Sequence, residues 1–196
     1  NTMTVGFALC GSFCTYDRIF PVMERLTKSY DIIPIFSQSA YTTDSRFGTA
    51  DDHIAKAEAI CGKPPLHTLA EVEPIGPKRL LDALVIAPCT GNTLAKLAHS
   101  IADGPVTMAA KSHLRNARPV LLAVSTNDAL AGAAENIGKL LGWKNYYFVP
   151  FRQDSWENKP TALADDKSLI PNAAAKPVSG QRSHPNLLAG PPEQVK

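Results

Sequence analysis

The sequence predicts a doubly wound α/β fold, in which a parallel β-sheet carries helices on both faces. Short runs that are apolar throughout alternate with stretches whose apolar residues recur at helical spacing. A strand that is buried on both faces lacks polar alternation, so such runs indicate a parallel sheet between two layers of helices. The chain has 196 residues, which is enough for one well-packed domain and short for two.

Five strands and five helices are expected along the chain. The predicted strands are Val5–Cys10, Ile32–Phe36, Leu84–Ala87, Val120–Val124 and Tyr146–Val149. The predicted helices are Thr15–Ser29, Ala50–Cys61, Thr93–His99, Ala129–Leu141 and, interrupted by Pro171, Asp165–Ala175. Neighbouring parallel strands need crossover connections, and the helices between the runs supply them.

The composition changes after Pro150. Seven prolines occur from there to Pro192, and the apolar periodicity largely disappears. We therefore expect residues 1–150 to form the α/β domain and residues 151–196 to form a Pro-rich C-terminal extension. From about Pro177 onward we expect a tail that is loose or lies over a neighbouring subunit.

Composition and charge exclude several functional classes. Lys and Arg total 20, Asp and Glu total 18, and the basic residues are scattered, so no nucleic-acid partner is expected. No apolar run approaches the roughly 20 residues that cross a bilayer, so no membrane association is expected. The four cysteines lack the dense spacing of a secreted disulfide framework and indicate a cytoplasmic protein with reduced thiols.

Four segments rich in small and hydroxyl residues follow the predicted strands. They are Gly11–Thr15, Ser37–Ala40, Pro88–Thr93 and Ser125–Asp128. In a doubly wound sheet, ligands bind outside the carboxyl ends of the strands, near the point where strand order reverses. Helix N–H groups and hydroxyls at such ends bind phosphate monoesters, although the same residue types are also preferred helix caps. Four such ends in one sheet favour a phosphorylated ligand.

Other common sites have no matching pattern. The first loop contains neither G-x-G-x-x-G nor G-x-x-x-x-G-K-[ST], and no G-x-S-x-G elbow occurs. The histidines form no H-x-x-x-H pair, and Cys10 and Cys14 have no second cysteine pair at metal spacing, so no metal site is predicted. Cys89 follows a strand and is a candidate reactive thiol, but burial as a small hydrophobic residue is the commoner role.

Several segments resemble a known flavoprotein family. The run from Ile86 to Ala98 is similar to the P-A-S-A-N-T segment of the flavin-dependent cysteine decarboxylases, and residues 99–110 are similar to the matching stretch of flavin prenyltransferases. Gly11-Ser12 and the Ser37–Ala40 segment are similar to the first two loops of that family. The resemblance covers residues 3 to about 150 and implies a Rossmann-like, flavodoxin-like fold.

A further set of segments is similar to the B subunits of dipicolinate synthases. They are Gly11–Tyr16, Ser45–Gly48, Glu73–Lys78, Met108–Lys111, Ser125–Leu130 and Val149–Asp154. Several of them lie outside the flavin loops, so shared cofactor binding does not explain them. This resemblance implies a subunit that oxidises a dihydro- or hydroxytetrahydrodipicolinate to dipicolinate in the mother cell of a sporulating bacterium. It also implies a separate nicotinamide-binding A subunit and a homo-oligomer, trimer-based as in relatives of this fold.

The resemblance implies FMN as the cofactor, with its phosphate near Ser12 and Ser37 and its ring near Thr90–Thr93. The candidate cofactor-binding residues are Gly11, Ser12, Ser37, Thr90, Gly91, Asn92, Thr93 and Ser125.

A small dicarboxylate substrate needs cationic partners, preferably a guanidinium that pairs through two hydrogen bonds. Arg46, Lys111 and Asn127 are the candidate substrate-binding residues. Lys78 and Arg115 are also available, but they are more typical of ordinary surface charges. Asn127 has a second interpretation, as the cap of the helix expected near Ala129.

The sequence departs from the related enzymes at two places. The decarboxylases carry a catalytic histidine before the P-A-S-A-N-T strand, whereas residues 71–78 contain none and His67 lies several residues too early. The prenyltransferases have Gly-Ala-Ser-Gly in the first loop, where Phe13 here would crowd a close backbone approach. No catalytic acid or base is assigned. A non-catalytic partner that stabilises the A subunit, or another flavin enzyme of the family, therefore remains open alongside a catalytic flavoprotein role.

Overall fold

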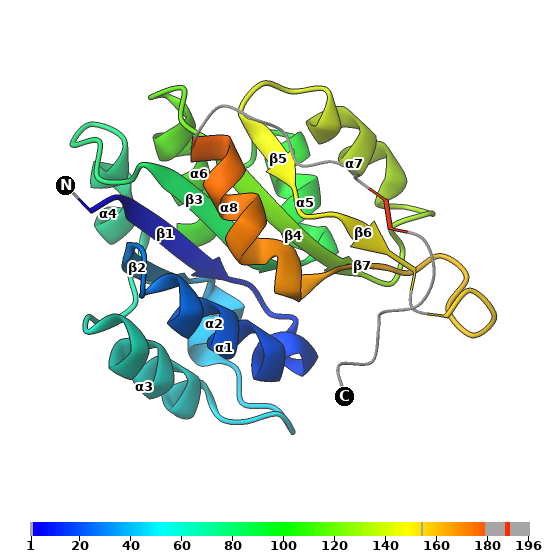
Figure 1. The fold of residues 1–196 in the computed structure, drawn as a ribbon, viewed down its shortest axis with the longest axis horizontal. Helices are drawn as coiled ribbons and strands as arrows, with labels where there is room; N and C mark the ends of the chain where they lie inside the picture. The colour runs from blue at the N-terminus through cyan, green and yellow to red at the C-terminus, as the bar shows by residue number, and fades with distance from the viewer. Residues whose placement is uncertain (1, 154, 179–186, 189–196) are drawn as a thin grey trace.

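The computed structural model describes residues 2–153, 155–178 and 187–188, and its strands form one twisted sheet between two layers of helices (Figure 1). The seven strands in these residues are β1 (Thr4–Leu9), β2 (Asp31–Phe36), β3 (Ala83–Cys89), β4 (Val120–Thr126), β5 (Tyr146–Phe148), β6 (Phe151–Arg152) and β7 (Leu163–Asp165). The five predicted strands are confirmed as β1 to β5. The doubly wound α/β fold class is confirmed with them.

The strand order places β1 and β3 in the middle of the sheet. The order is β2-β1-β3-β4-β7-β6, and β5 also pairs with β4. Strands β1 to β5 are all parallel and follow the flavodoxin-like order 2-1-3-4-5. β5 pairs with the first half of β4 and β7 with its last two residues, so both lie along the same edge of β4. The sheet is mixed rather than purely parallel, because β7 runs antiparallel to both of its neighbours, β4 and β6.

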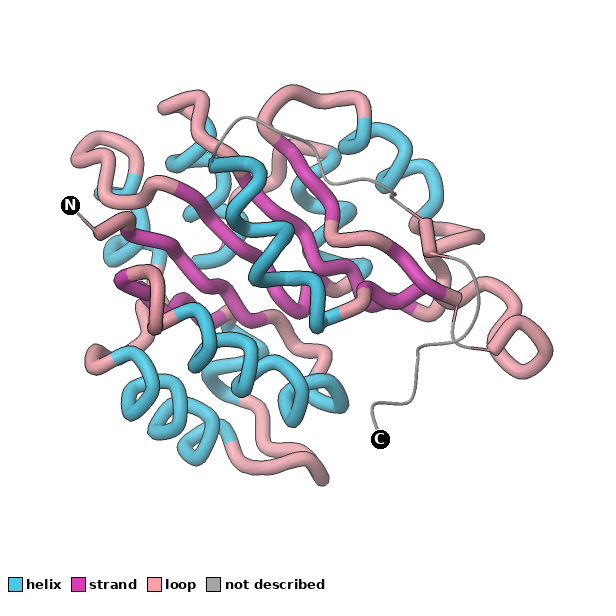
Figure 2. The backbone as a smooth tube through the Cα atoms, viewed as in Figure 1, coloured by secondary structure: helices cyan, strands magenta, loops and turns pink. Residues whose placement is uncertain are grey.

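Helices cover both faces of the sheet, as the tube view shows (Figure 2). One face carries α1 (Tyr16–Leu26), α3 (Ala50–Cys61) and α8 (Ile170–Val178). The other carries α4 (Leu69–Val72), α5 (Gly91–Ala98), α6 (Pro105–Leu114) and α7 (Ala134–Leu141), and α2 (Gln38–Thr42) follows the end of β2. Short 3₁₀ turns occupy Phe13–Thr15, Glu73–Ile75 and Lys167–Leu169.

The fully apolar strands fill two cores at once. Phe7 and Leu9 of β1 join the core under α1 and α8, whereas Ala8 joins the core under α5 and α6. Val85 and Ile86 of β3 divide in the same way. Successive side chains of a strand point to opposite faces, so a strand between two helix layers must be apolar at every position.

The helix after β4 begins later than the sequence predicts. The predicted helix Ala129–Leu141 is wrong over its first turn, because α7 begins at Ala134. Residues before it form turns in which the N–H groups of Ala131 and Ala133 donate to Asp128. The N–H of Leu130 instead donates to the carbonyl of Thr161, 2.9 Å away, in a segment far along the chain. A long-range hydrogen bond therefore replaces the local helical one.

Residues beyond Pro150 add to the same sheet and core. β6 and β7 extend the sheet, and Ile170, Ala173 and Ala174 of α8 are buried against it. Figure 1 shows α8 lying across β3 and β4 beside α1. Within the Pro-rich segment, Leu187 forms an isolated bridge with Phe151, while most of the tail expected after Pro177 lies outside the described residues. That residues 1–150 form a domain by themselves stays a prediction.

The buried side of α8 should contribute strongly to stability. Ile170→Ala should lower the free energy of unfolding by about 2–5 kcal/mol, because it removes a fully buried side chain and leaves a cavity. Asn172→Ala, on the exposed side of the same helix, should change it by less than about 0.5 kcal/mol. Urea unfolding followed by circular dichroism measures both. Equal stability of the two variants would show that α8 does not belong to the cooperative unit.

Candidate functional site

The main candidate site lies where the strand order reverses, between the carboxyl ends of β1 and β3. The chain leaves β1 toward β2 on one side and leaves β3 toward β4 on the other, so the loops that follow them separate. A cavity of about 470 Å³ opens there. It is lined by the first loop, the start of α2, the start of α5 and the segment that leads into α6. These residues include Cys10, Gly11, Phe13, Ser37, Gln38, Ser39, Thr90, Asn92, Thr93, Lys96 and Asp103–Thr107.

Ser37 and Thr90 cap the helices that border this cavity. The Ser37 hydroxyl oxygen accepts a hydrogen bond from the N–H of Ala40 at 3.1 Å, and that of Thr90 accepts one from the N–H of Thr93 at 3.2 Å. Thr90 donates its own proton to Thr93 Oγ1, and Thr93 donates to the sulfur of Cys10. The Ser37 proton has no acceptor among the described residues, so it is available to a ligand.

Aromatic side chains support the first loop. The Tyr16 hydroxyl donates to the carbonyl of Cys10 at 2.7 Å, and burial raises the pKa of this phenol. The ring of Phe13 meets that of Tyr16 edge-on at 5.5 Å and stacks over the imidazole of buried His53 at 6.5 Å. Phe13 therefore lines the cavity with its ring held between Tyr16 and His53.

The charged residues of this cavity are paired with each other. Lys96 donates to the Asp103 carboxylate at 2.9 Å, and this hydrogen bond lowers the pKa of Asp103. Asp103 is thus negative at neutral pH, but Lys96 balances it. Sequence reasoning missed Lys96 and Asp103 as lining residues, although Asp103 belongs to the stretch that resembles flavin prenyltransferases.

The two buried cysteines beside the cavity are poor nucleophiles. Burial raises the pKa of the Cys10 thiol from 9.0 to about 11, and the hydrogen bond from Thr93 offsets part of this effect. Burial also raises the pKa of Cys89 well above its ordinary value. Both thiols stay protonated at neutral pH, and Cys89 is fully buried in the core. The structure therefore favours the interpretation of Cys89 as a small hydrophobic residue.

A second cavity of about 180 Å³ lies at the carboxyl ends of β1 and β4. Ser12, Ser125 and Asn127, three of the predicted site residues, line this cavity rather than the larger one. The Asn127 side chain caps no helix, because α7 starts at Ala134 and has no side-chain cap. The alternative role of Asn127 as a helix cap is therefore wrong. Its amide has no hydrogen-bond partner within the described part of the chain.

Gly91 lies where the two cavities approach each other. A Cβ atom at this position would lie 2.9 Å from Thr126 Oγ1 and 3.4 Å from Asp128 Oδ1. Only a residue without a side chain lets the start of α5 come this close to the end of β4. Gly91 thus connects the loop of the larger cavity with the wall of the smaller one.

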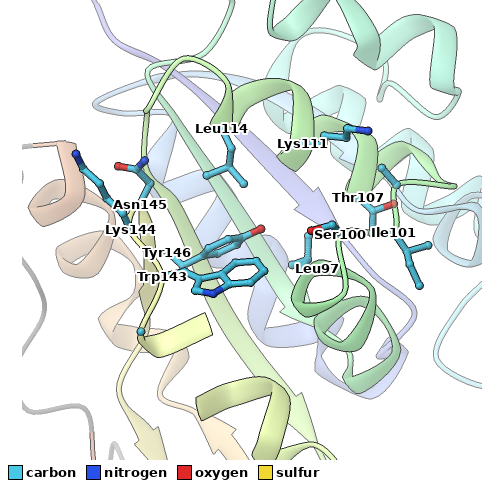
Figure 3. A pocket seen from close by; sticks show the side chains of 12 residues that line it. Leu97, Ser100, Ile101, Thr107, Lys111, Leu114, Trp143, Lys144, Asn145 and Tyr146 are labelled. Carbon is cyan, nitrogen blue, oxygen red and sulfur yellow. The ribbon is translucent and has the colours of Figure 1, made fainter. Parts of the chain in front are cut away.

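Lys111 and Arg46 lie away from both cavities. Lys111 borders a third cavity of about 550 Å³, on the face of the sheet that α5, α6 and α7 cover. Figure 3 shows Lys111 at the rim of this cavity, with Trp143 and Tyr146 side by side within it. Arg46 sits in the exposed turn from Ser45 to Gly48, and its guanidinium lies over the Phe47 ring at 4.8 Å. The predicted substrate-binding residues are thus not brought together.

His67 has a defined setting, but it does not line the main cavity. Its ring stacks on Tyr41 of α2 at 3.7 Å, and its Nδ1 lies 3.4 Å from the Glu71 carboxylate. The backbone N–H groups of His67 and Thr68 donate to the same carboxylate and lower the pKa of Glu71. The catalytic residues of the site stay unassigned.

The described residues contain neither a metal-binding cluster nor a membrane-spanning helix. No three side chains of His, Cys, Asp or Glu there come close enough together to hold a metal ion. No helix among these residues is long and apolar enough to cross a membrane.

Comparison with known proteins identifies the family. The sequence profile of the Flavoprotein family matches residues 1–147, so the chain belongs to that family. Over 185 residues it is 40% identical to the B subunit of dipicolinate synthase from Bacillus subtilis (strain 168), covering 94% of this chain and 92% of that protein. The resemblance to such B subunits that the sequence motifs predict is thereby confirmed.

Solved structures agree with this assignment. The crystal structure of the dipicolinate synthase B subunit from Bacillus halodurans C superposes with a TM-score of 0.87 at 40% identity, over 95% of this chain and 96% of that one. The FMN-dependent cysteine decarboxylase SpaF superposes with a TM-score of 0.65 at 21% identity, over 89% of this chain and 97% of that one. The decarboxylase therefore shares the fold.

The cysteines give a test of this arrangement. A thiol reagent at pH 8 should modify exposed Cys14 first and leave Cys10 and Cys89 unmodified until the protein unfolds, because burial blocks access and suppresses their thiolates. Mass spectrometry before and after adding urea counts the modified thiols. Cys14→Ser should remove the first modification and leave the later ones. Modification of Cys89 ahead of Cys14 in the folded protein would contradict the buried setting.

Proposed function

We propose that the chain is an FMN-binding B subunit of a dipicolinate synthase, with the cofactor in the 470 Å³ cavity. The observation that carries this proposal is the position of that cavity at the β1/β3 switch point, where flavodoxin-like sheets hold FMN. The 40% identity to such a B subunit over nearly the whole chain supports the particular assignment. The FMN-dependent relative of the same fold supports the cofactor.

The residues present fit a phosphate monoester. Ser37 offers a free hydroxyl proton, and the Asn92 amide is exposed without a partner among the described residues. Gly11 lets the first loop pass close to α2, since an added Cβ would lie 3.2 Å from Ser39 Cβ. Asp103, the one carboxylate among the described residues that line the cavity, is paired with Lys96. No unpaired carboxylate among the described lining residues would repel a dianionic phosphate.

The chain's own residues would bind and orient the cofactor. Ser37 and the first loop are proposed for the phosphate, and the Thr90–Thr93 turn for the ring, whereas Ser12 and Ser125 line the smaller cavity. A bound flavin would supply a two-electron acceptor. The cavity volume is within the range of about 300–1,000 Å³ that is usual for small-molecule sites.

The proposed reaction is a step in the oxidation of a dihydro- or hydroxytetrahydrodipicolinate to dipicolinate during sporulation. The naming of the relatives as B subunits supports a partner, proposed here as a nicotinamide-binding A subunit. A homo-oligomer, trimer-based, is part of the same proposal.

Replacing Ser37 tests the cofactor site. Ser37→Ala should weaken FMN binding by roughly 10- to 150-fold, because one hydrogen bond to a charged group contributes about 1.5–3 kcal/mol. The variant also loses a helix cap, so Thr49→Ala is the matched control, since Thr49 caps α3 through the same kind of bond outside the cavity. Fluorescence titration with FMN measures the affinities. Equal FMN affinities for both variants would remove Ser37 from the site.

Reconstitution tests the catalytic role. The purified protein, the A subunit, a precursor and a nicotinamide cofactor should together form dipicolinate, followed by its ultraviolet absorption. Omitting this protein should reduce the rate, and adding FMN to flavin-free protein should restore it. If the A subunit alone reaches the full rate, the protein is a non-catalytic partner, and a rise in the thermal stability of the A subunit on mixing would support that role.

A further inference from the structure

The 180 Å³ cavity gathers cations and uncharged donors from distant parts of the chain. Arg18 comes from the first turn of α1, Ser125 and Asn127 from the end of β4, and Lys159 from the segment between β6 and β7. The described residues that line it include two cations and no carboxylate. Such a composition favours an anionic ligand.

We propose that this cavity binds the carboxylates of a small planar dicarboxylate, with Arg18 and Lys159 as its cationic partners. The proposal rests on the function proposed above, and it assigns the substrate to residues that sequence reasoning did not single out. Arg46 and Lys111, which the sequence favoured for this role, lie elsewhere.

The polar groups of the cavity are free to bind. Ser125 and Asn127 make no side-chain hydrogen bond within the described residues, and neither does the Lys159 ammonium group. The Arg18 side chain is 63% exposed, and its nearest carboxylate, that of Asp17, lies 3.9 Å from Nε. The planar Arg18 guanidinium can therefore pair with a carboxylate through two parallel hydrogen bonds.

Two of the neighbouring acids, Asp128 and Asp165, already have partners. Asp128 accepts the Thr126 hydroxyl proton at 2.6 Å, and buried Asp165 pairs with Lys167 at 2.9 Å. The charge of Arg18 also acts on Asp165, but that carboxylate is enclosed and does not line the cavity. A ligand carboxylate would therefore meet the two cations with no competing acid in the described lining.

Two hydrogen bonds hold the segment that carries Lys159. The Thr161 hydroxyl donates to the carbonyl of Asn127 at 2.7 Å, which joins this segment to the end of β4. The amide of Gln153 donates to the carbonyl of Pro160 at 2.8 Å and closes the turn. Lys159 therefore approaches the cavity from a different element than Arg18 of α1.

The size and position of the cavity suit one ring. A cavity of about 150 Å³ accepts a benzene molecule, so 180 Å³ is enough for a single six-membered ring with its carboxylates toward the rim. Gly91 brings the Thr90–Asn92 turn of the larger cavity against Thr126 of this one. A ring in this cavity would thus lie next to the proposed cofactor site.

Titration calorimetry with pyridine-2,6-dicarboxylate tests the proposal. Arg18→Gln and Lys159→Gln should each weaken its binding about 10-fold, the lower end for a charge-assisted hydrogen bond because both side chains are partly screened by water. Arg25→Gln on the same helix, Arg46→Gln and Lys111→Gln should leave it unchanged. The buffer must be free of divalent cations, which the probe chelates. Both cations are exposed, so their replacement leaves the core intact.

Two further probes define the ligand class. Pyridine-2-carboxylate should bind the unaltered protein at least about 10-fold more weakly than the dicarboxylate, because it forms only one of the two charge-assisted pairs. Inorganic phosphate at the same concentration should not displace the dicarboxylate. Equal affinity for all three probes would mean a general anion site and would overturn the proposal.

Other results of these titrations would also overturn the proposed dicarboxylate site. No binding by the unaltered protein at millimolar dicarboxylate, or a loss only in Arg46→Gln or Lys111→Gln, would overturn the assignment. Titrations with and without FMN separate this result from the cofactor proposal. The protein could bind the dicarboxylate through Arg18 and Lys159 and yet take up no FMN. That result would support the proposed dicarboxylate site and contradict the proposed cofactor.

Discussion

Because β1 and β3 pair side by side at the centre of the sheet, the loops that follow them cannot fill the space between them. Val5–Ala8 of β1 lie in register with Ala83–Ile86 of β3, and the chain then departs from each strand in opposite directions. The opening at their carboxyl ends is therefore a consequence of topology rather than of any single residue. Side chains decide only what that opening can bind.

The sequence predicts the elements whose signals are local. All-apolar strands are recognisable because both of their faces are buried, and the caps Ser37 and Thr90 are recognisable because a hydroxyl precedes each helix. The start of α7 could not be predicted in this way. Leu130 donates to the carbonyl of Thr161, and no pattern within a short window reveals a hydrogen bond to so distant a segment.

The difference between local and long-range signals also explains which site residues the sequence does not reveal. Lys111 belongs to a motif that resembles the B subunits, but its position on α6 places it at the rim of the third cavity. Arg18 looks like any polar residue on the exposed face of an amphipathic helix, and Lys159 lies in a Pro-rich stretch without periodicity. Only the packing of the segment around Thr161 against the end of β4 brings both residues to one cavity.

The described part of the segment between β6 and β7 lines the smaller cavity but not the larger one. The larger cavity is built, among the described residues, by those that precede Thr126, whereas Lys159, Ala162 and Leu163 form one wall of the smaller cavity. Changes of length or charge in that wall leave the strands of the switch point untouched. Ligand preference can thus change in one stretch of chain while the residues that line the larger cavity stay the same.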